Sequence, residues 1–119
     1  MSANKAKGTS FETDVVNFLK PEFPHAERRA SAGKNDKGDI AGIYNAKGSW
    51  ALECKNVQRI TLSEFVDEAK AEATNAGADY YAAIVKRRRK GVAHAFVVME
   101  LEQFRSLVSV SERETGAGR

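Results

Sequence analysis

The stretch Ser-Trp-Ala-Leu-Glu-Cys-Lys, residues 49–55, has the composition of a β-strand that ends in an acid and an amine. Side chains alternate between the two faces of a strand, so Glu53 and Lys55 point one way while Leu52 and Cys54 point the other. If Leu52 and Cys54 face a core, the charged pair needs solvent or a cleft, because burying unpaired charge is costly. The stretch alone leaves two interpretations open: a solvated ion pair on an edge strand, or one corner of a functional site.

A second apolar run, residues 39–44, precedes this stretch and is separated from it by the turn-forming residues 45–48. We expect the two runs to pair as an antiparallel hairpin. Asp39 opens the first strand and Glu53 closes the second, so this pairing brings both carboxylates to one end of the sheet, with Lys55 just beyond. The alternative is that Asp39 belongs to a turn and that Glu53 forms a simple salt bridge.

Two neighbouring carboxylates repel each other unless a cation lies between them, and oxygen ligands suit Mg²⁺ or Mn²⁺. Such a cation can activate water and neutralise charge on a phosphate, while a nearby ammonium orients the nucleophile or stabilises the transition state. Asp39, Glu53 and Lys55 therefore point to phosphodiester hydrolysis.

Two helices are expected to begin at capping boxes, because Thr9 and Glu12, and likewise Thr61 and Glu64, have the required spacing. The second of these helices has an alanine-rich apolar stripe suited to close packing on a sheet and ends at Gly77. Its opposite face carries Glu64, Asp67, Glu68, Lys70 and Glu72.

Periodicity and turn chemistry predict the remaining order of elements. We expect a helix from Thr9 to Pro21, a short strand within 25–32, a turn at 33–38, the hairpin, a helix over 61–77, strands over 80–85 and 93–99, and a short helix over 101–108. This order predicts one α/β domain over residues 1–110, with a central mixed β-sheet flanked by helices, and a flexible tail over 111–119.

The composition narrows the class of protein. The chain has 119 residues, of which 42% are hydrophobic and 29% charged, and no segment approaches the roughly 20 apolar residues of a membrane span. The N-terminus lacks an apolar signal core, and the single cysteine, Cys54, has no partner for an internal disulfide. We therefore expect a cytoplasmic protein with no membrane partner. The net charge of +3 permits a polyanionic partner without requiring one.

Three motifs, in order, resemble the pattern of the PD-(D/E)xK nuclease superfamily and specifically of archaeal-type Holliday junction resolvases. They are Glu12, Gly38-Asp39-Ile40 and Glu53-Cys54-Lys55. The similarity runs over about residues 7–107 and includes Lys7-Gly8 before the first helix and Arg28, Arg29, Ser31 and Gly33 ahead of the second motif. Gly38 stands where the family motif has proline, but the carboxylate that follows it is kept.

The resemblance implies a restriction-endonuclease-like fold and a metal-dependent endonuclease. Asp39, Glu53 and Glu12 would bind Mg²⁺ or Mn²⁺, Lys55 would assist the attacking water, and Ser31 would be a further active-site residue. A resolvase makes two symmetric cuts, so the resemblance also implies a homodimer acting on four-way or other branched DNA. Small relatives are also carried by phages, for which the location would be the host cytoplasm.

A run of five basic residues lies at the tip of the last predicted hairpin, where their repulsion would be relieved by a phosphate backbone. A solvated turn is the simpler explanation of such a run. The residues that we expect to contact DNA are Lys7, Arg28, Arg29, Lys34, Lys37, Lys86, Arg87, Arg88, Arg89 and Lys90.

Two alternative functions remain open at this point. One is a phage nuclease of recombination or restriction type that cuts linear or single-stranded DNA, which differs from a resolvase in its substrate preference. The other is a non-catalytic DNA-binding module in which the acids form only a structural cluster.

Overall fold

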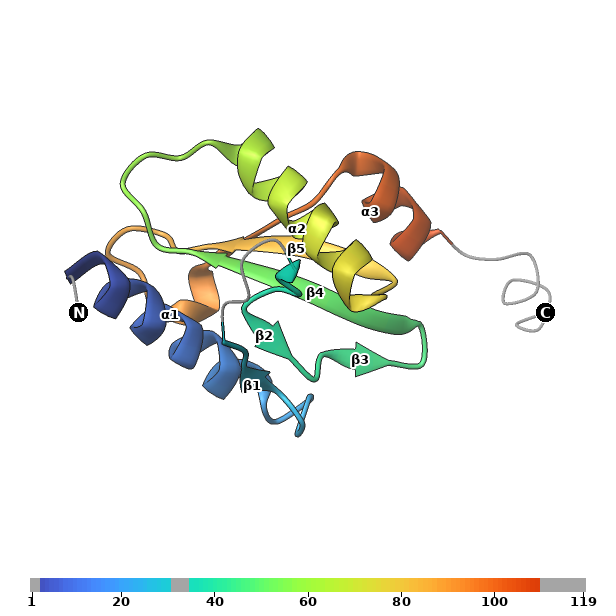
Figure 1. The fold of residues 1–119 in the computed structure, drawn as a ribbon, viewed down its shortest axis with the longest axis horizontal. Helices are drawn as coiled ribbons and strands as arrows, with labels where there is room; N and C mark the ends of the chain where they lie inside the picture. Colours follow the sequence, from blue (N-terminus) through green and yellow to red (C-terminus); the bar gives the residue numbers. More distant parts are fainter. Residues whose placement is uncertain (1–2, 31–34, 110–119) are drawn as a thin grey trace.

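The computed structural model describes residues 3–30 and 35–109 and forms an α/β domain with a mixed sheet flanked by three helices (Figure 1). The sheet order is β1-β2-β4-β5-β6, and β3 pairs with the N-terminal part of β4. The elements are α1 (Ala3–Leu19), β1 (Glu27–Arg28), β2 (Ile40–Ala41), β3 (Tyr44–Asn45), β4 (Gly48–Lys55), α2 (Leu62–Ala76), β5 (Tyr80–Val85), the 3₁₀ helix η2 (Val92–His94), β6 (Phe96–Val98) and α3 (Leu101–Val108).

Strand β4 is the central strand, and the predicted mixed sheet is confirmed around it. It pairs antiparallel with β2 and β3 and parallel with β5, with Glu53 opposite Ala83. Helix α2 connects the two parallel strands and packs on both of them. Because β4 has neighbours on both sides, the stretch of residues 49–55 is not an edge strand.

The two faces of the sheet have separate cores. Leu52 and Cys54 of β4 are buried with Phe11 and Val15 of α1. On the other face, Phe65 of α2 packs on β5. Strand alternation therefore directs Glu53 and Lys55 toward α2, while Leu52 and Cys54 face a core.

Helix α1 begins earlier than predicted. It starts at Ala3, so Thr9 and Glu12 lie inside the helix and the predicted capping box is wrong. The Thr13 hydroxyl instead donates to the Thr9 carbonyl oxygen at 3.0 Å. The helix-favouring alanines and lysines of residues 3–7 extend the helix upstream through Gly8, which costs only about 1 kcal/mol there.

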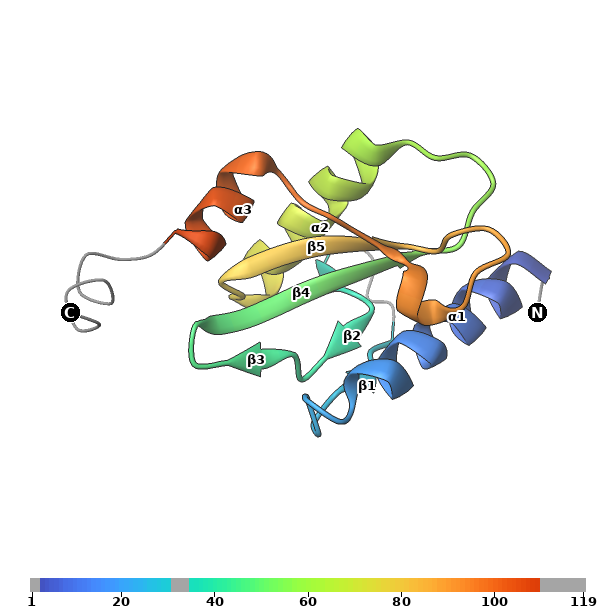
Figure 2. The same ribbon diagram turned by 180° about the vertical axis from the view of Figure 1, so that it is seen from behind.

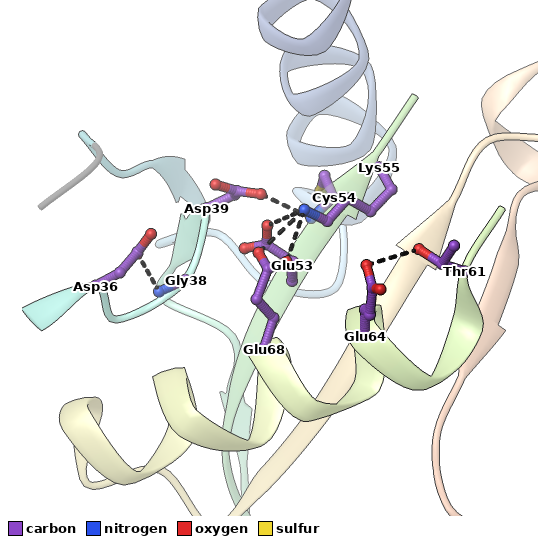
Figure 3. Close-up of polar contacts among 9 residues, drawn as sticks. All are labelled: Asp36, Gly38, Asp39, Glu53, Cys54, Lys55, Thr61, Glu64 and Glu68. Carbon is purple, nitrogen blue, oxygen red and sulfur yellow. Dashed lines mark hydrogen bonds and ion pairs between the residues drawn. The ribbon is translucent and has the colours of Figure 1, made fainter. Parts of the chain in front are cut away.

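Helix α2 begins after Thr61 and ends at Gly77 as predicted, with Gly77 in the left-handed conformation at φ 65°. The capping box is wrong in its detail, because the Thr61 hydroxyl makes no hydrogen bond to the helix backbone. It donates to Glu64 Oε2 at 3.2 Å (Figure 3). The alanines at positions 69 and 73 are buried, which lets the helix approach the sheet closely.

The predicted strand over residues 39–44 is split into β2 and β3. Gly42 separates them at φ 82°, where an added Cβ would lie 2.0 Å from the carbonyl oxygen of His25. The backbone at Gly42 therefore passes so close to the backbone at His25 that only glycine fits. The backbone turns at Gly42, and the hydrogen-bonded pairing of β2 ends there. Ile40 still lies opposite Leu52, as expected for an antiparallel pair.

The predicted strand over residues 93–99 is shorter than expected. Its first part forms η2, which packs beside α1, and only Phe96–Val98 pairs with β5 (Figure 2). The basic run thus lies in the loop between β5 and η2 and not at the tip of a two-stranded hairpin. The short strand near residues 25–32 and the final helix are present as β1 and α3. Within residues 3–30 and 35–109, no helix is long and apolar enough to cross a membrane.

Candidate active site

Glu53 and Lys55 lie side by side at the end of β4, under α2. Lys55 Nζ lies 3.0 Å from Glu53 Oε2 and also 3.0 Å from Glu68 Oε2 of α2 (Figure 3). The ammonium also lies 5.3 Å from the ring centre of Phe65. Glu53 is only 5% exposed, so the pair is not the solvated surface ion pair that the stretch alone allowed.

Asp39 is fixed beside this pair by the backbone of β4. Its Oδ2 accepts a hydrogen bond from the Cys54 amide at 2.7 Å (Figure 3). Its own amide donates to the Leu52 carbonyl oxygen at 2.8 Å. The antiparallel register of β2 and β4 therefore brings Asp39 and Glu53 to the same end of the sheet.

Burial raises the pKa of the Cys54 thiol, so this cysteine stays protonated and is not a nucleophile.

Glu12 approaches the same region from α1 but is already paired. Arg28 Nε lies 3.2 Å from Glu12 Oε1. The negative charge of Glu12 nevertheless contributes, after burial, to raising the pKa of Asp39. Glu12 thus lies near Asp39, and one of its carboxylate oxygens is paired with Arg28. Arg28 is one of the residues that we expected to contact DNA.

Three acids at this end of the sheet were not predicted as site residues: Asp36, Glu68 and Glu72. One carboxylate oxygen each from Asp36, Glu53 and Glu72 lie within 4.8 Å of one another. Glu72 is 4% exposed, so its assignment to the solvent side of the helix is wrong. Its spacing of seven from Phe65 and three from Ala69 places it in the buried stripe, a signal that the sequence contained.

Two of these carboxylates have a buried oxygen without a partner. Glu53 Oε1 and Glu72 Oε1 are inaccessible to solvent and accept no hydrogen bond from any residue that the structure describes. Buried polar atoms are nearly always satisfied, so an unpaired one calls for a ligand, a proton or water. Such atoms fit a cation that binds oxygen.

The pKa values of the acids reflect burial and mutual repulsion. Burial raises the pKa of Asp39 to about 6. The hydrogen bond from the Cys54 amide favours the charged form and lowers this pKa, but by less than burial raises it. Burial also raises the pKa of Glu72 to about 7, with repulsion from Asp36 and Asp39 adding to it. The pKa of Glu53 is raised furthest, by burial first and then by its contact with Glu72. These carboxylates need protons or a bound cation to share one site.

Lys55 remains charged in this setting. Burial lowers its pKa, but the carboxylates of Glu68 and Glu53 more than offset this, so the pKa is above its ordinary value. Lys55 is therefore an ammonium at neutral pH, able to donate hydrogen bonds but unable to accept a proton.

An open groove begins directly after Lys55. It has a volume of about 1200 Å³ and starts at Asn56 and Val57. Its lining is largely apolar and includes Phe96 and Phe104, both about half exposed. Four residues of the basic run and one lysine of α1 line it, namely Lys86, Arg87, Arg88, Arg89 and Lys7.

The other predicted DNA contacts have different surroundings. The guanidinium of Arg29 folds back and donates to the carbonyl oxygen of Lys37. The side chain of Lys86 donates to the carbonyl oxygen of Lys90. Ser31 and Lys34 lie outside the described residues.

No protein-family model, curated protein or solved structure matches this chain.

Proposed function

We propose that this protein is a divalent-cation-dependent endodeoxyribonuclease that hydrolyses phosphodiester bonds in four-way or other branched DNA and acts as a homodimer. The observation that carries the proposal is the convergence of Asp39, Glu53 and Lys55 at one end of β4. These are the residue types, in the same chain order, on which the resemblance to the PD-(D/E)xK nucleases depends. DNA as the substrate implies a cytoplasmic location, or the host cytoplasm for a phage-encoded chain.

Asp39 and Glu53 are the residues that would hold Mg²⁺ or Mn²⁺, with Glu12 beside Asp39. The fit is supported by the unpaired buried oxygen of Glu53 and by oxygen chemistry that suits these ions. When bound, the cation would supply positive charge for the phosphate and lower the pKa of water.

Lys55 acts as a fixed positive charge in this proposal. Because its pKa is raised, it donates a hydrogen bond to water or to a phosphate oxygen and stabilises the negative charge that grows there. Water oxygen forms a bond to phosphorus as the bond to the 3′ oxygen breaks. Water loses a proton to solvent, the 3′ oxygen takes one up, and a 5′-phosphate is left. Glu53 and Glu68 keep the ammonium in place from two sides.

The test is a panel of labelled DNA with Mg²⁺, comprising a four-way junction, a nicked duplex, a linear duplex and a single strand. The wild-type protein is compared with Asp39→Asn and Lys55→Ala. Asp67→Asn, an exposed aspartate of α2, is the matched control. We expect junction cleavage by the wild type and the control and loss of cleavage in the two site variants. Equal cleavage by all four proteins would overturn the proposal.

A nuclease of linear or single-stranded DNA is the second candidate function. It is favoured by the groove beside Lys55, because half-exposed phenylalanines next to arginines suit stacking against unpaired bases. Preferential cleavage of the single strand in the same panel selects this candidate. Salt-sensitive binding without cleavage of any substrate selects the non-catalytic DNA-binding module.

A further inference from the structure

Asp36, Glu53 and Glu72 come from three separate segments that the fold holds together. Glu53 belongs to β4 and Glu72 to α2, while Asp36 lies in the loop before β2. Asn75 Nδ2 of α2 donates to the Asp36 carbonyl oxygen at 2.8 Å, which ties the loop to the helix one turn from Glu72. Asp36 Oδ1 accepts a hydrogen bond from the Gly38 amide at 2.9 Å, which orients its carboxylate (Figure 3).

The described residues provide too little positive charge for the acids gathered here. Ion pairs to them come from Lys55, which binds Glu53 and Glu68, and from Arg28, which binds Glu12. The described acids at this end of the sheet are Glu12, Asp36, Asp39, Glu53, Glu68 and Glu72. Ionised carboxylates in a buried site are stable only beside a counter-charge.

Glu53 and Glu72 supply a second observation that points to a ligand. Each is more than nine-tenths buried, and each has one oxygen that accepts no hydrogen bond from the described part of the chain. Lys55 satisfies only the other oxygen of Glu53. A carboxylate that merely filled space in the alanine-rich stripe of α2 would be replaced at lower cost by an apolar residue.

The spacing of the oxygens fits a small divalent cation. Oxygens on opposite sides of a Mg²⁺ or Ca²⁺ ion lie about 4 to 5 Å apart. The three carboxylate oxygens lie within 4.8 Å of one another, at the upper end of this range, so the carboxylates must move slightly closer for one ion to contact all three. Hard oxygen ligands without nitrogen or sulfur favour Mg²⁺ and Mn²⁺ over zinc.

We propose that Asp36, Glu53 and Glu72 form a divalent-cation site in which α2 and the loop before β2 each supply a ligand. Asp36 and Glu72 lie outside the ligand set that the nuclease resemblance implies, whereas Glu53 belongs to both sets. The cation site therefore shares Glu53 with the proposed nuclease centre, and it is tested by metal binding and not by cleavage. The cation fastens this loop, and with it Asp39, against α2.

The test measures Mn²⁺ binding directly, by calorimetric titration and by the electron paramagnetic resonance signal of free Mn²⁺. We expect Glu72→Gln and Asp36→Asn to weaken Mn²⁺ binding by at least about tenfold. Glu64→Gln is the matched control, because Glu64 is an exposed acid of the same helix that contacts Thr61. Circular dichroism shows whether each variant is folded, and Mn²⁺ should raise the melting temperature of the wild type more than that of Glu72→Gln.

Asp39→Asn separates this site from the proposed catalytic one. We expect Asp39→Asn to lose DNA cleavage and still to bind Mn²⁺. Adding Glu72→Gln to Asp39→Asn should weaken that Mn²⁺ binding. Unchanged Mn²⁺ affinity in folded Glu72→Gln and Asp36→Asn, or no Mn²⁺ binding by the wild type, would overturn the cation site. Mn²⁺ binding through Glu72 without any DNA cleavage by the wild type would keep it and overturn the nuclease.

Discussion

Lys55 Nζ lies 3.0 Å from Glu53 Oε2, while Glu53 Oε1 accepts no hydrogen bond from the residues that the structure describes. One half of this buried carboxylate is therefore neutralised by the protein, and the other half is left for a ligand. Lys55 is shared with Glu68, so the ammonium is held between a strand and a helix.

Replacing Lys55 with alanine should slow cleavage by about 10²- to 10³-fold, because a fixed positive charge that stabilises the transition state is lost. DNA affinity should change little, since one of many positive charges is removed. Single-turnover cleavage of the junction and fluorescence anisotropy measure the two effects. Lys55→Arg keeps the charge and should retain more activity than Lys55→Ala. Wild-type rates in Lys55→Ala would show that Lys55 has no part in the chemistry.

Without divalent cations, the free energy of unfolding should fall as the pH rises from 4.5 to about 7. Burial raises the pKa of Glu72 from 4.5 to about 7, so between these values the folded chain holds a proton that the unfolded chain has lost. The folded state then binds more protons, and stability decreases with rising pH. Urea unfolding in EDTA at several pH values measures this trend.

Glu72→Gln removes one of the groups whose pKa is raised and should flatten that trend in part, since Asp39 and Glu53 still contribute to it. At pH 8 in EDTA the variant should be more stable than the wild type by about 1 to 3 kcal/mol, and Glu64→Gln should not be. A wild-type stability that rises over this pH range would contradict the pKa of Glu72.

Much of the fold followed from local pattern. The alternation in β4 predicted which side chains face the core, and the stripe and terminal glycine of α2 predicted that helix. The predicted start of α1 at Thr9 was wrong, because the capping signal there is weaker than the helix propensity of the residues before it. Local sequence does not say which of two compatible starts the helix uses.

The candidate site was predictable only along the hairpin. Asp39 and Glu53 are brought together by pairing between neighbouring strands, which sequence patterns indicate well. The spacing of Glu72 puts it within the apolar stripe of α2. Because charged residues are rarely buried, Glu72 was instead predicted to face solvent. Asp36 depends on a contact with Asn75, 39 positions away, which no local pattern encodes.

Gly42→Ala and Gly77→Ala should differ strongly in stability. At Gly42 an added Cβ would lie 2.0 Å from the His25 carbonyl oxygen, so the backbone must move, at a cost of about 3 kcal/mol or more. At Gly77 an added Cβ would have no described residue within 4 Å apart from its chain neighbours, and only the positive φ of 65° opposes alanine, at about 1 kcal/mol. Urea denaturation measures both. Equal losses in the two variants would contradict the close approach at Gly42.

Removing two arginines of the basic run should weaken DNA binding and its dependence on salt. Arg87 and Arg88 both line the groove next to Lys55, and Arg87 lies 5.1 Å from the ring centre of Phe96. Each phosphate contact contributes nearly one unit to the slope of log affinity against log salt, so Arg87→Ala with Arg88→Ala should reduce that slope by about 2.

Fluorescence anisotropy with labelled junction DNA from low to moderate salt gives this slope. Lys20→Ala with Lys47→Ala is the control of equal charge, because neither residue lines the groove. If phosphates bind along the groove, only the arginine pair changes the slope, whereas a general effect of net charge would lower it equally in both double variants. An unchanged slope in the arginine variant would mean that the basic run is a solvated loop and that DNA reaches Lys55 by another surface.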